Sequence, residues 1–246
     1  MIYEKIKKII NSVIPRKVLT KYESILRYFY YQLYRGKRFQ CNVCNKKLRE
    51  FISLKSGEKL CPFCGSSSRN RRLWKILVSD FLKSDIRILH FSPSRSLKRF
   101  LSKYPSLNYI TSDFMGEFDA DKHYNITDIS ESDNTFDLII CYHILEHIED
   151  DREAMNELYR VLKNGGNCII QTPFKDGEIY ENDKIKTAED RLKYFGQEDH
   201  VRIYSVDGLK ERLANTGFEV KVNKFNEEKN NYNGLSEEES VLIARK

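Results

Sequence analysis

The feature that most restricts the fold of this chain is the alternation, after residue 85, of apolar strand-like runs with amphipathic stretches. We expect strands at 86–91, 108–112, near Tyr124, 136–142, 166–172, 217–222 and 240–244. Helices are expected between most of them, at 93–103, 151–162 and 206–216. This pattern predicts an α/β fold, a doubly wound and mainly parallel seven-stranded sheet with right-handed crossovers. The polar loop "NEEKNNYNGLSEEE" predicts an antiparallel hairpin at the end of the sheet.

Four of the six cysteines form one pattern, Cys41-x-x-Cys44 and then, after sixteen intervening residues, Cys61-x-x-Cys64. Two such loops at this spacing predict a site in which four thiolates hold a structural zinc ion. Gly65 relieves strain in the second loop, and the intervening stretch predicts a short hairpin around Ser56 and Gly57. The other two cysteines, Cys141 and Cys168, lie in apolar runs and are expected in the core.

Charge divides the chain into a basic and an acidic part. Residues 1–79 hold 19 Lys/Arg and 4 Asp/Glu, a net charge of +15, whereas the remainder holds 23 and 32, a net charge of −9. The basic part favours contact with nucleic acid, anionic lipid or a phosphorylated substrate, or docking on the acidic remainder. The expected segments are a basic aromatic helical segment at 1–40, a zinc-ribbon module at 41–68, a linking helix at 69–85 and the α/β domain at 86–246.

The basic part is expected to begin with two helices broken near Pro15, the second over 20–38. Its aromatic face suits packing on a neighbouring domain, with peripheral contact to a membrane as the alternative. The linking helix has serine caps and carries Arg69, Arg71 and Arg72 in its first turn, where cations are electrostatically unfavourable. The triplet is therefore a candidate anion-binding group, or simply exposed arginines. With no apolar run of membrane-spanning length and no secretory signal, a cytoplasmic location is expected.

Polar side chains follow the expected strands at the place where doubly wound sheets bind ligands, outside the carboxyl ends. An acid after the second strand can accept both hydroxyls of a ribose. An aspartate followed by an apolar residue can hold an adenine amino group while its neighbour covers the ring, although either acid could equally cap a turn. The residues at these strand ends are His90, Phe91, Ser92, Asp113, Phe114, Asp128, Ile129, Tyr142 and His143.

The stretch "ITDISESDNTFDLIICYHILEHIEDDREAMNELYRVLKNGGNCIIQTP" resembles the small-molecule type of class I S-adenosylmethionine-dependent methyltransferases, and the resemblance extends loosely over 86–246. It implies a Rossmann-like methyltransferase fold and S-adenosylmethionine as cofactor. Asp113 would bind the ribose, Asp128 with Ile129 the adenine, and Tyr142 with His143 the sulfonium end. The cysteine loops followed by "GSSSRNRR" and "LHFSP" resemble a bacterial subgroup with an N-terminal four-cysteine zinc ribbon, often found beside surface-polysaccharide genes.

The turn "IRILHFSPSRSL" departs from that family, which usually has an acid at the position of His90 and glycines after it. With Ser92 as N-cap and Pro93 as first helical residue, the first-turn N–H groups could receive the methionine carboxylate of the cofactor. The hydroxyl of Ser92 or Ser94 would assist. The alternative is a degenerate turn that no longer binds the cofactor.

The run "HILEH", from His143 to His147, also matches the H-x-x-E-H motif of a zinc protease group. On a helix the two histidines would share a face with Glu146 as base. The methyltransferase resemblance explains the same residues without a second metal. One zinc equivalent would fit the thiolates alone, and two would favour the protease.

Methyl transfer to a hydroxyl or amine often needs a general base, and we expect His143 and His200 to face the substrate in that role. His147 is expected to be structural. Arg202 would hold an acidic substrate group or pair with Glu198 or Asp199. The expected reaction is O-methylation of a small molecule, a sugar or a phosphate-bearing surface-polysaccharide intermediate. The alternatives are an RNA methyltransferase whose basic zinc module binds RNA, and a non-catalytic binding protein.

Overall fold

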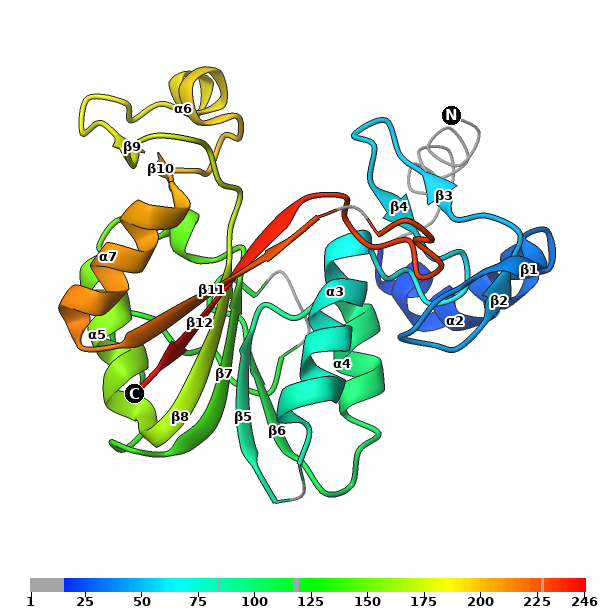
Figure 1. Ribbon diagram of the computed structural model, residues 1–246, viewed down its shortest axis with the longest axis horizontal. Coiled ribbons are helices and arrows are strands. Elements are labelled where there is room, and N and C mark those ends of the chain that lie inside the picture. The colour runs from blue at the N-terminus through cyan, green and yellow to red at the C-terminus, as the bar shows by residue number, and fades with distance from the viewer. Residues whose placement is uncertain (1–15, 84, 117–119, 227) are drawn as a thin grey trace. The chain divides into compact units, whose positions relative to one another are not determined.

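The computed structural model describes residues 16–83, 85–116, 120–226 and 228–246, with side chains from residue 22 onward. These residues form two units (Figure 1). The N-terminal unit contains the described residues up to Leu82 together with Ser94–Lys103 and Asn226–Glu239. The sheet unit contains Lys83–Pro93, Tyr104–Phe225 and Ser240–Lys246, apart from the undescribed positions. Segments that are distant in sequence therefore join the zinc-ribbon region.

The sheet unit is built on six strands in the order β11-β12-β8-β7-β5-β6 (Figure 1). Neighbouring strands run parallel from β6 to β8, and β12 runs antiparallel to β8. The predicted α/β fold with a mainly parallel, doubly wound sheet is confirmed. The strand bounds are β5 (Arg87–Phe91), β6 (Asn108–Ser112), β7 (Phe136–Tyr142), β8 (Leu162–Gln171), β11 (Glu219–Phe225) and β12 (Glu239–Arg245).

The prediction of a seventh strand near Tyr124 is wrong. In this region the described chain makes a single parallel bridge between Ser112 and Lys122. A few backbone bonds, such as that from the Lys122 N–H to the Thr111 carbonyl, are joined there by side-chain bonds. The Asp121 carboxylate accepts from the backbone N–H of Thr111 at 2.9 Å, and Ser112 Oγ accepts from the backbone N–H of Tyr124 at 2.9 Å. Asp and Ser side chains that bond nearby backbone compete with strand pairing in this way.

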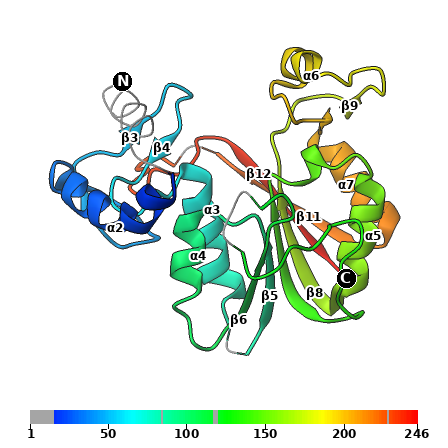
Figure 2. The same ribbon diagram turned by 180° about the vertical axis from the view of Figure 1, so that it is seen from behind.

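The core of the sheet unit lies between the sheet and two helices, α5 (Asp151–Val161) and α7 (Val206–Thr216), which lie on one of its faces (Figures 1 and 2). Both helices match the predicted ranges to within a residue, and Asp150 and Ser205 cap their N-termini. Strand β7 reads as a continuous apolar run because it is buried on both faces. Cys141 and Cys168 are fully buried in this core, as predicted.

A smaller substructure of the sheet unit consists of short elements, one before β8 in the chain and three after it. The element before β8 is η2 (Leu145–His147), and those after it are β9 (Tyr180–Glu181), α6 (Ala188–Phe195) and β10 (Arg202–Ile203). Strands β9 and β10 pair antiparallel. No helix of the described residues has the length and apolar character needed to cross a membrane.

The N-terminal unit contains three helices and two small hairpins in its described part. Its elements are α2 (Arg16–Gln32), β1 (Arg35–Gln40), β2 (Lys47–Leu48), β3 (Ile52–Ser53), β4 (Lys59–Leu60), α3 (Ser68–Ile76), the π-helical turn η1 (Leu77–Phe81) and α4 (Arg95–Leu101). Strands β3 and β4 form the predicted hairpin around Gly57, which has a φ of 82°. Ser67 caps α3 by accepting from the backbone N–H of Asn70.

The predicted helix over 20–38 is too long, because α2 ends at Gln32 and Arg35–Gln40 is a strand. Gly36 requires this change. Its backbone lies so close to Arg49 that a Cβ atom would fall 2.5 Å from the Arg49 nitrogen. The Tyr34 carbonyl also accepts from the Arg49 N–H at 2.8 Å. The helix predicted before Pro15 lies outside the described residues.

Candidate functional site

The four predicted metal ligands come together in the N-terminal unit. One Sγ atom from each of Cys41, Cys44, Cys61 and Cys64 lies within 4.8 Å of the others. The Cys41–Cys64 and Cys44–Cys61 sulfur pairs are 3.6 and 3.7 Å apart. Tetrahedral zinc with bonds of about 2.3 Å would place its sulfurs about 3.8 Å apart. The spacing of these thiols therefore fits a zinc ion.

The two cysteine loops share one backbone design. Cys41 O accepts from the N–H of Asn45, and Cys61 O accepts from the N–H of Gly65. Asn45 and Gly65 both have positive φ angles, 58° and 78°. Asn and Gly adopt this conformation most readily, so Gly65 relieves the loop as predicted. This geometry turns both sulfurs of each loop toward one point.

The arginine triplet does not form an anion-binding group. The Arg71 side chain is fully buried, and its guanidinium donates to the carbonyls of Ser66 at 2.6 Å, Lys59 at 2.9 Å and Asn233 at 2.7 Å, and also to that of Gly234. It thereby holds the β11–β12 connection against the cysteine loops, both within the N-terminal unit. This guanidinium is a structural clamp, a role that the charge pattern alone did not indicate.

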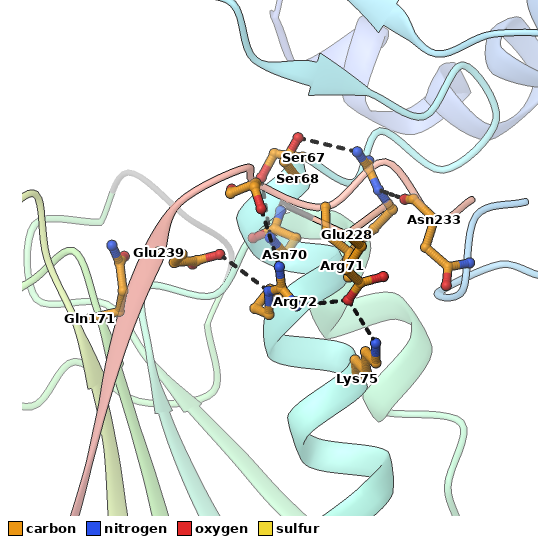
Figure 3. Close-up of polar contacts among 12 residues, drawn as sticks. Ser67, Ser68, Asn70, Arg71, Arg72, Lys75, Gln171, Glu228, Asn233 and Glu239 are labelled. Carbon is orange, nitrogen blue, oxygen red and sulfur yellow. Dashed lines mark hydrogen bonds and ion pairs between the residues drawn. The ribbon is translucent and has the colours of Figure 1, made fainter. Parts of the chain in front are cut away.

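Arg72 is equally buried and lies between two carboxylates (Figure 3). Its guanidinium is 3.2 Å from Glu228 and 3.8 Å from Glu239, while Lys75 lies 2.9 Å from Glu228. Burial raises the pKa of Glu239 to about 7, although Arg72 acts in the opposite direction. The third arginine, Arg69, is partly exposed and 4.0 Å from Glu58.

Most of the predicted cofactor residues of the sheet unit lie at the carboxyl ends of β5, β6 and β7, whereas Asp128 and Ile129 lie in the segment between β6 and β7. Strand β5 pairs with both of the others, and the chain passes from β5 to β6 before it returns to β7 on the opposite side. This reversal is where open α/β sheets bind their ligands. Ser92 after β5 and His143 after β7 have φ angles of 42° and 55°. Left-handed backbone at a non-glycine residue is costly and gathers at binding sites.

The glycine-free turn differs from the expected cap. Ser94, not Ser92, is the N-cap, and α4 begins at Arg95. Ser92 Oγ instead donates to Asp113 Oδ1 at 2.7 Å, and the N–H of Ser92 donates to the Ser112 carbonyl. Ser94 Oγ accepts from the Leu97 N–H and from the side-chain amide of Asn70, so it serves the N-terminal unit. Ser92 takes the left-handed position that a glycine would otherwise fill.

His90, near the carboxyl end of β5, is neutral. It is buried beneath the strand end, and burial lowers its pKa to about 3. Its Nδ1 lies 2.9 Å from the Tyr109 hydroxyl. An uncharged imidazole cannot neutralise the ammonium group of an amino-acid ligand, so this end of the candidate site lacks its usual counter-charge.

The remaining predicted cofactor residues divide by exposure. The carboxylate of Asp113 is nearly buried, whereas Phe114 and Asp128 are exposed. Phe91 and Ile129 lie in the core, and Ile129 donates its N–H to Glu157 at 2.7 Å. At the end of β8, buried Gln171 Oε1 and Thr172 Oγ1 have no hydrogen-bond partner among the described residues. Unpaired buried polar atoms are hydrogen-bonding sites for a ligand.

The predicted base His143 is oriented by Glu146. Burial acts to raise the pKa of Glu146, but the hydrogen bond with His143 acts against it, and the pKa lies below its usual value. Because an ionised carboxylate only accepts, His143 donates its Nδ1 proton to Glu146 Oε1 at 3.1 Å. This leaves Nε2 of His143 as the basic atom. The protease arrangement is wrong, since η2 is a three-residue 3₁₀ turn and not a helix presenting both histidines.

The second predicted base, His200, packs edge-on against His147 with ring centroids 4.7 Å apart. Burial, followed by the proximity of His147, lowers the pKa of His200. Sequence reasoning did not find this pair, because the two residues are distant in the chain. One ligand atom from each of Glu146, His147 and His200 lies within 4.8 Å of the other two.

Arg202 fixes the segment that carries His200. It is buried, donates to the carbonyls of Ile148 and Glu149, and pairs with Glu181 at 2.9 Å. Val201 N–H also donates to Glu146 O at 2.9 Å. The predicted partners Glu198 and Asp199 are therefore wrong, and the guanidinium is committed to protein groups instead of an acidic substrate.

Comparison with known proteins assigns the family. Residues 57–221 match the family model described as "Methyltransferase domain". An uncharacterized protein of Methanocaldococcus jannaschii is 35% identical over 37% of this chain and 38% of its own length. Phosphoethanolamine N-methyltransferase 2 of Caenorhabditis elegans is 33% identical over 32% of this chain and 18% of its own length. The chain thus matches well under half of either relative.

Solved structures agree on the fold. An S-adenosylmethionine-dependent methyltransferase from Archaeoglobus fulgidus superposes with a TM-score of 0.51 at 18% identity, over 72% of this chain and 91% of the other. The family match and this fold define the class: the chain belongs to the methyltransferase-domain family. The chain shares the fold of that S-adenosylmethionine-dependent methyltransferase.

The buried clamp gives a stability prediction. Arg71→Lys removes the planar fork and leaves several buried carbonyls unpaired, each costing about 1–3 kcal/mol. We expect the free energy of unfolding to fall by about 3 kcal/mol, which lowers the melting temperature by roughly 6–12 °C in a chain of this size. Thermal unfolding followed by circular dichroism measures the change. Arg69→Lys is the matched control and should shift the transition little; equal shifts for both variants would contradict the clamp.

The Arg72–Glu239 pair gives a pH prediction. A carboxyl whose folded pKa is about 7, against an ordinary 4.5, binds its proton more tightly in the folded state. Its contribution to stability is therefore complete below pH 4.5 and lost as pH rises through 7. Glu239→Gln, which cannot ionise, should match the wild type near pH 4.5 and be about 3 kcal/mol more stable at pH 8.

Urea unfolding at both pH values tests this expectation, with the exposed Glu237→Gln as control. A Glu239→Gln variant that is less stable than the wild type at pH 8 would show instead that the ionised pair with Arg72 is net stabilising.

Proposed function

We propose that this chain transfers the methyl group of S-adenosylmethionine to a small molecule, at the carboxyl edge of β5, β6 and β7. The observation that carries the proposal is the buried Asp113 carboxylate, held by Ser92 at 2.7 Å where a doubly wound sheet binds its ligand. Methyltransferase relatives support the same cofactor. When bound, the cofactor supplies an electrophilic methyl group on a sulfonium.

The residues of the chain would bind and orient the cofactor in the order in which they follow the strands. Asp113 would accept the ribose hydroxyls, with Phe114 beside it. Asp128 would accept the adenine amino group, whereas burial of Ile129 in the core leaves it a supporting role. Tyr142 and His143 would lie at the sulfonium end. The strained backbone of Ser92 supports a turn adapted to bind without glycine, although His90 supplies no charge for the amino-acid end.

Proton removal from the acceptor would fall to His143. Glu146 holds its Nδ1 proton, so Nε2 can accept a proton from a hydroxyl or amine. This arrangement, in which a carboxylate orients an imidazole base, recurs in unrelated enzymes. His200 is the second candidate, because its lowered pKa keeps it neutral at pH 7. A neutral imidazole can accept a proton, and it can equally bind a metal ion.

The acceptor we infer is a small hydroxylated molecule, a sugar or a phosphate-bearing intermediate of surface-polysaccharide synthesis. A phosphorylated acceptor is supported by the similarity to a phosphoethanolamine N-methyltransferase. The buried arginines give it no support, since Arg71 and Arg72 already bind protein groups. The same burial removes two cations from any RNA-binding surface, so RNA is the weaker candidate.

The four cysteines would hold one structural zinc ion. Their sulfur separations fit tetrahedral coordination, and four protein ligands leave no position for water or substrate. Zinc would tie together the two loops to which Arg71 also binds, through Ser66 and Lys59. In this role the metal supports the unit and takes no part in the chemistry.

Calorimetric titration with S-adenosylhomocysteine tests the cofactor site. We expect saturable binding to the wild type, weakened roughly 10- to 100-fold in Asp113→Asn, because a hydrogen bond to a charged group contributes about 1.5–3 kcal/mol. Asp183→Asn, an exposed acid away from the strand ends, should bind like the wild type. Absence of heat with both this ligand and S-adenosylmethionine would show that the turn is degenerate and favour a non-catalytic binding protein.

Measurement of turnover tests His143 as the general base. Sugar nucleotides and phosphorylated alcohols are screened for release of S-adenosylhomocysteine, and kcat is then measured on the acceptor found. His143→Gln should lower kcat by about 10²- to 10⁴-fold, the usual contribution of a general base. The affinity for S-adenosylhomocysteine should change far less. Unchanged turnover in this variant would remove His143 from the mechanism.

A further inference from the structure

Glu146, His147 and His200 form a cluster of potential metal ligands that is separate from the four cysteines and belongs entirely to the sheet unit. Glu146 and His200 are 1% and 4% exposed, while the side chain of His147 is 30% exposed. Two ligands are thus shielded from water, and the third faces it. A cation could reach such a site through the exposed side.

The clearest indication of a metal site is an unpaired carboxylate oxygen of Glu146. Its Oε1 accepts from His143, whereas its Oε2 is buried and has no hydrogen bond within the described part of the chain. A buried carboxylate oxygen without a hydrogen-bond donor is costly unless a cation is near.

The two histidines are arranged as metal-bound imidazoles usually are. Nδ1 of His147 lies 3.1 Å from Asp199, and a backbone hydrogen bond to Phe195 acts on His200. A carboxylate or carbonyl on one ring nitrogen fixes the tautomer and leaves the other nitrogen for a metal. On His147 the remaining nitrogen is Nε2.

The segments that carry the ligands are held together independently of any ion. Val201 N–H donates to Glu146 O, and Arg202 binds the carbonyls of Ile148 and Glu149. These bonds join the η2 turn to the strand that follows His200. Ligand atoms at about 2.0–2.1 Å from a tetrahedral ion lie about 3.4 Å apart, so the side chains must close by at most about 1.5 Å. Rotation about side-chain bonds supplies this movement.

We propose that Glu146 Oε2, His147 Nε2 and a ring nitrogen of His200 bind a divalent transition-metal ion, such as Zn²⁺ or Fe²⁺. Two imidazoles and one carboxylate suit these ions, and three protein ligands leave at least one position open. His143 would share Glu146 with the ion, because its Nδ1 lies 3.1 Å from Glu146 Oε1. In this arrangement His200 is a metal ligand and not a base.

The role proposed for the ion rests on the proposed methyl transfer and adds detail to that reaction. An acceptor hydroxyl bound at the open position would have its pKa lowered by the cation. Its proton would pass to Nε2 of His143, and the oxygen would remain on the metal as the nucleophile. The acceptor class that this site favours is therefore an alcohol, which fits a sugar better than an amine.

Cobalt binding tests the site in the intact protein. The protein is first loaded with one zinc equivalent, which the thiolates retain, and is then titrated with Co²⁺. We expect one further Co²⁺ per chain with weak d–d absorption, without the intense sulfur-to-cobalt charge transfer that thiolate binding produces. Failure of Co²⁺ to bind, or charge transfer showing exchange at the cysteines alone, would overturn the proposal.

Asp199→Asn is the decisive variant, because its side chain is 68% exposed and its loss cannot disturb the core. Loss of such an outer partner weakens metal binding by about 10- to 100-fold. The neighbouring exposed Glu198→Gln is the matched control and should bind Co²⁺ like the wild type. The double variant His147→Gln/His200→Gln should abolish binding while the zinc content stays at one; Co²⁺ retained by it would overturn the assignment.

The same samples are titrated with S-adenosylhomocysteine, so that a failure of the metal site and a failure of the proposed methyl transfer can be distinguished. In the wild-type protein, failure of Co²⁺ to bind while the cofactor binds would refute the metal site alone. Co²⁺ binding without cofactor binding would leave the metal site standing and refute the proposed methyl transfer.

Discussion

The parallel register of β5, β7 and β8 is the constraint on which the candidate site depends. His90 pairs with Ile140, and Tyr142 pairs with Gln171, so the strands reach their carboxyl ends together. Main-chain hydrogen bonds hold this register, and burial of β7 on both faces prevents a slip that would expose apolar side chains. Residues that are separate in the chain therefore meet at one edge.

Two buried guanidinium groups hold irregular segments of this protein in place, as main-chain hydrogen bonds do within helices and strands. Arg71 ties the β11–β12 connection to the cysteine loops, and Arg202 ties the η2 turn to the segment of His200. Both arginines donate mainly to backbone carbonyls, which otherwise would be buried without a partner. The several N–H donors of each planar guanidinium hold irregular segments in place where helices and strands end. Charge near a functional segment is thus no proof of an anion site.

Glu146 takes part in both proposals for the site, the general base and the metal ion. One oxygen orients His143, and in the proposed metal site the other would bind the ion together with His147 and His200. A single buried carboxylate can serve a base and a cation because its two oxygens accept independently. The left-handed backbone of His143 places its ring at this carboxylate, and the strain of that conformation has a function in either case.

Most elements of the sheet, the cysteine loops and the strand-end position of Asp113 follow from the sequence alone, because apolar periodicity, Cys-x-x-Cys spacing and helix caps act over a few residues. The tertiary structure decided what depends on distant contacts. It buried Arg71 and Arg72, left only isolated bridges where a strand was expected near Tyr124, and moved the cap from Ser92 to Ser94. It also brought His200 to His147 and Glu146. Contacts between residues that are distant in the chain leave no local pattern in the sequence, so only the packed structure reveals them.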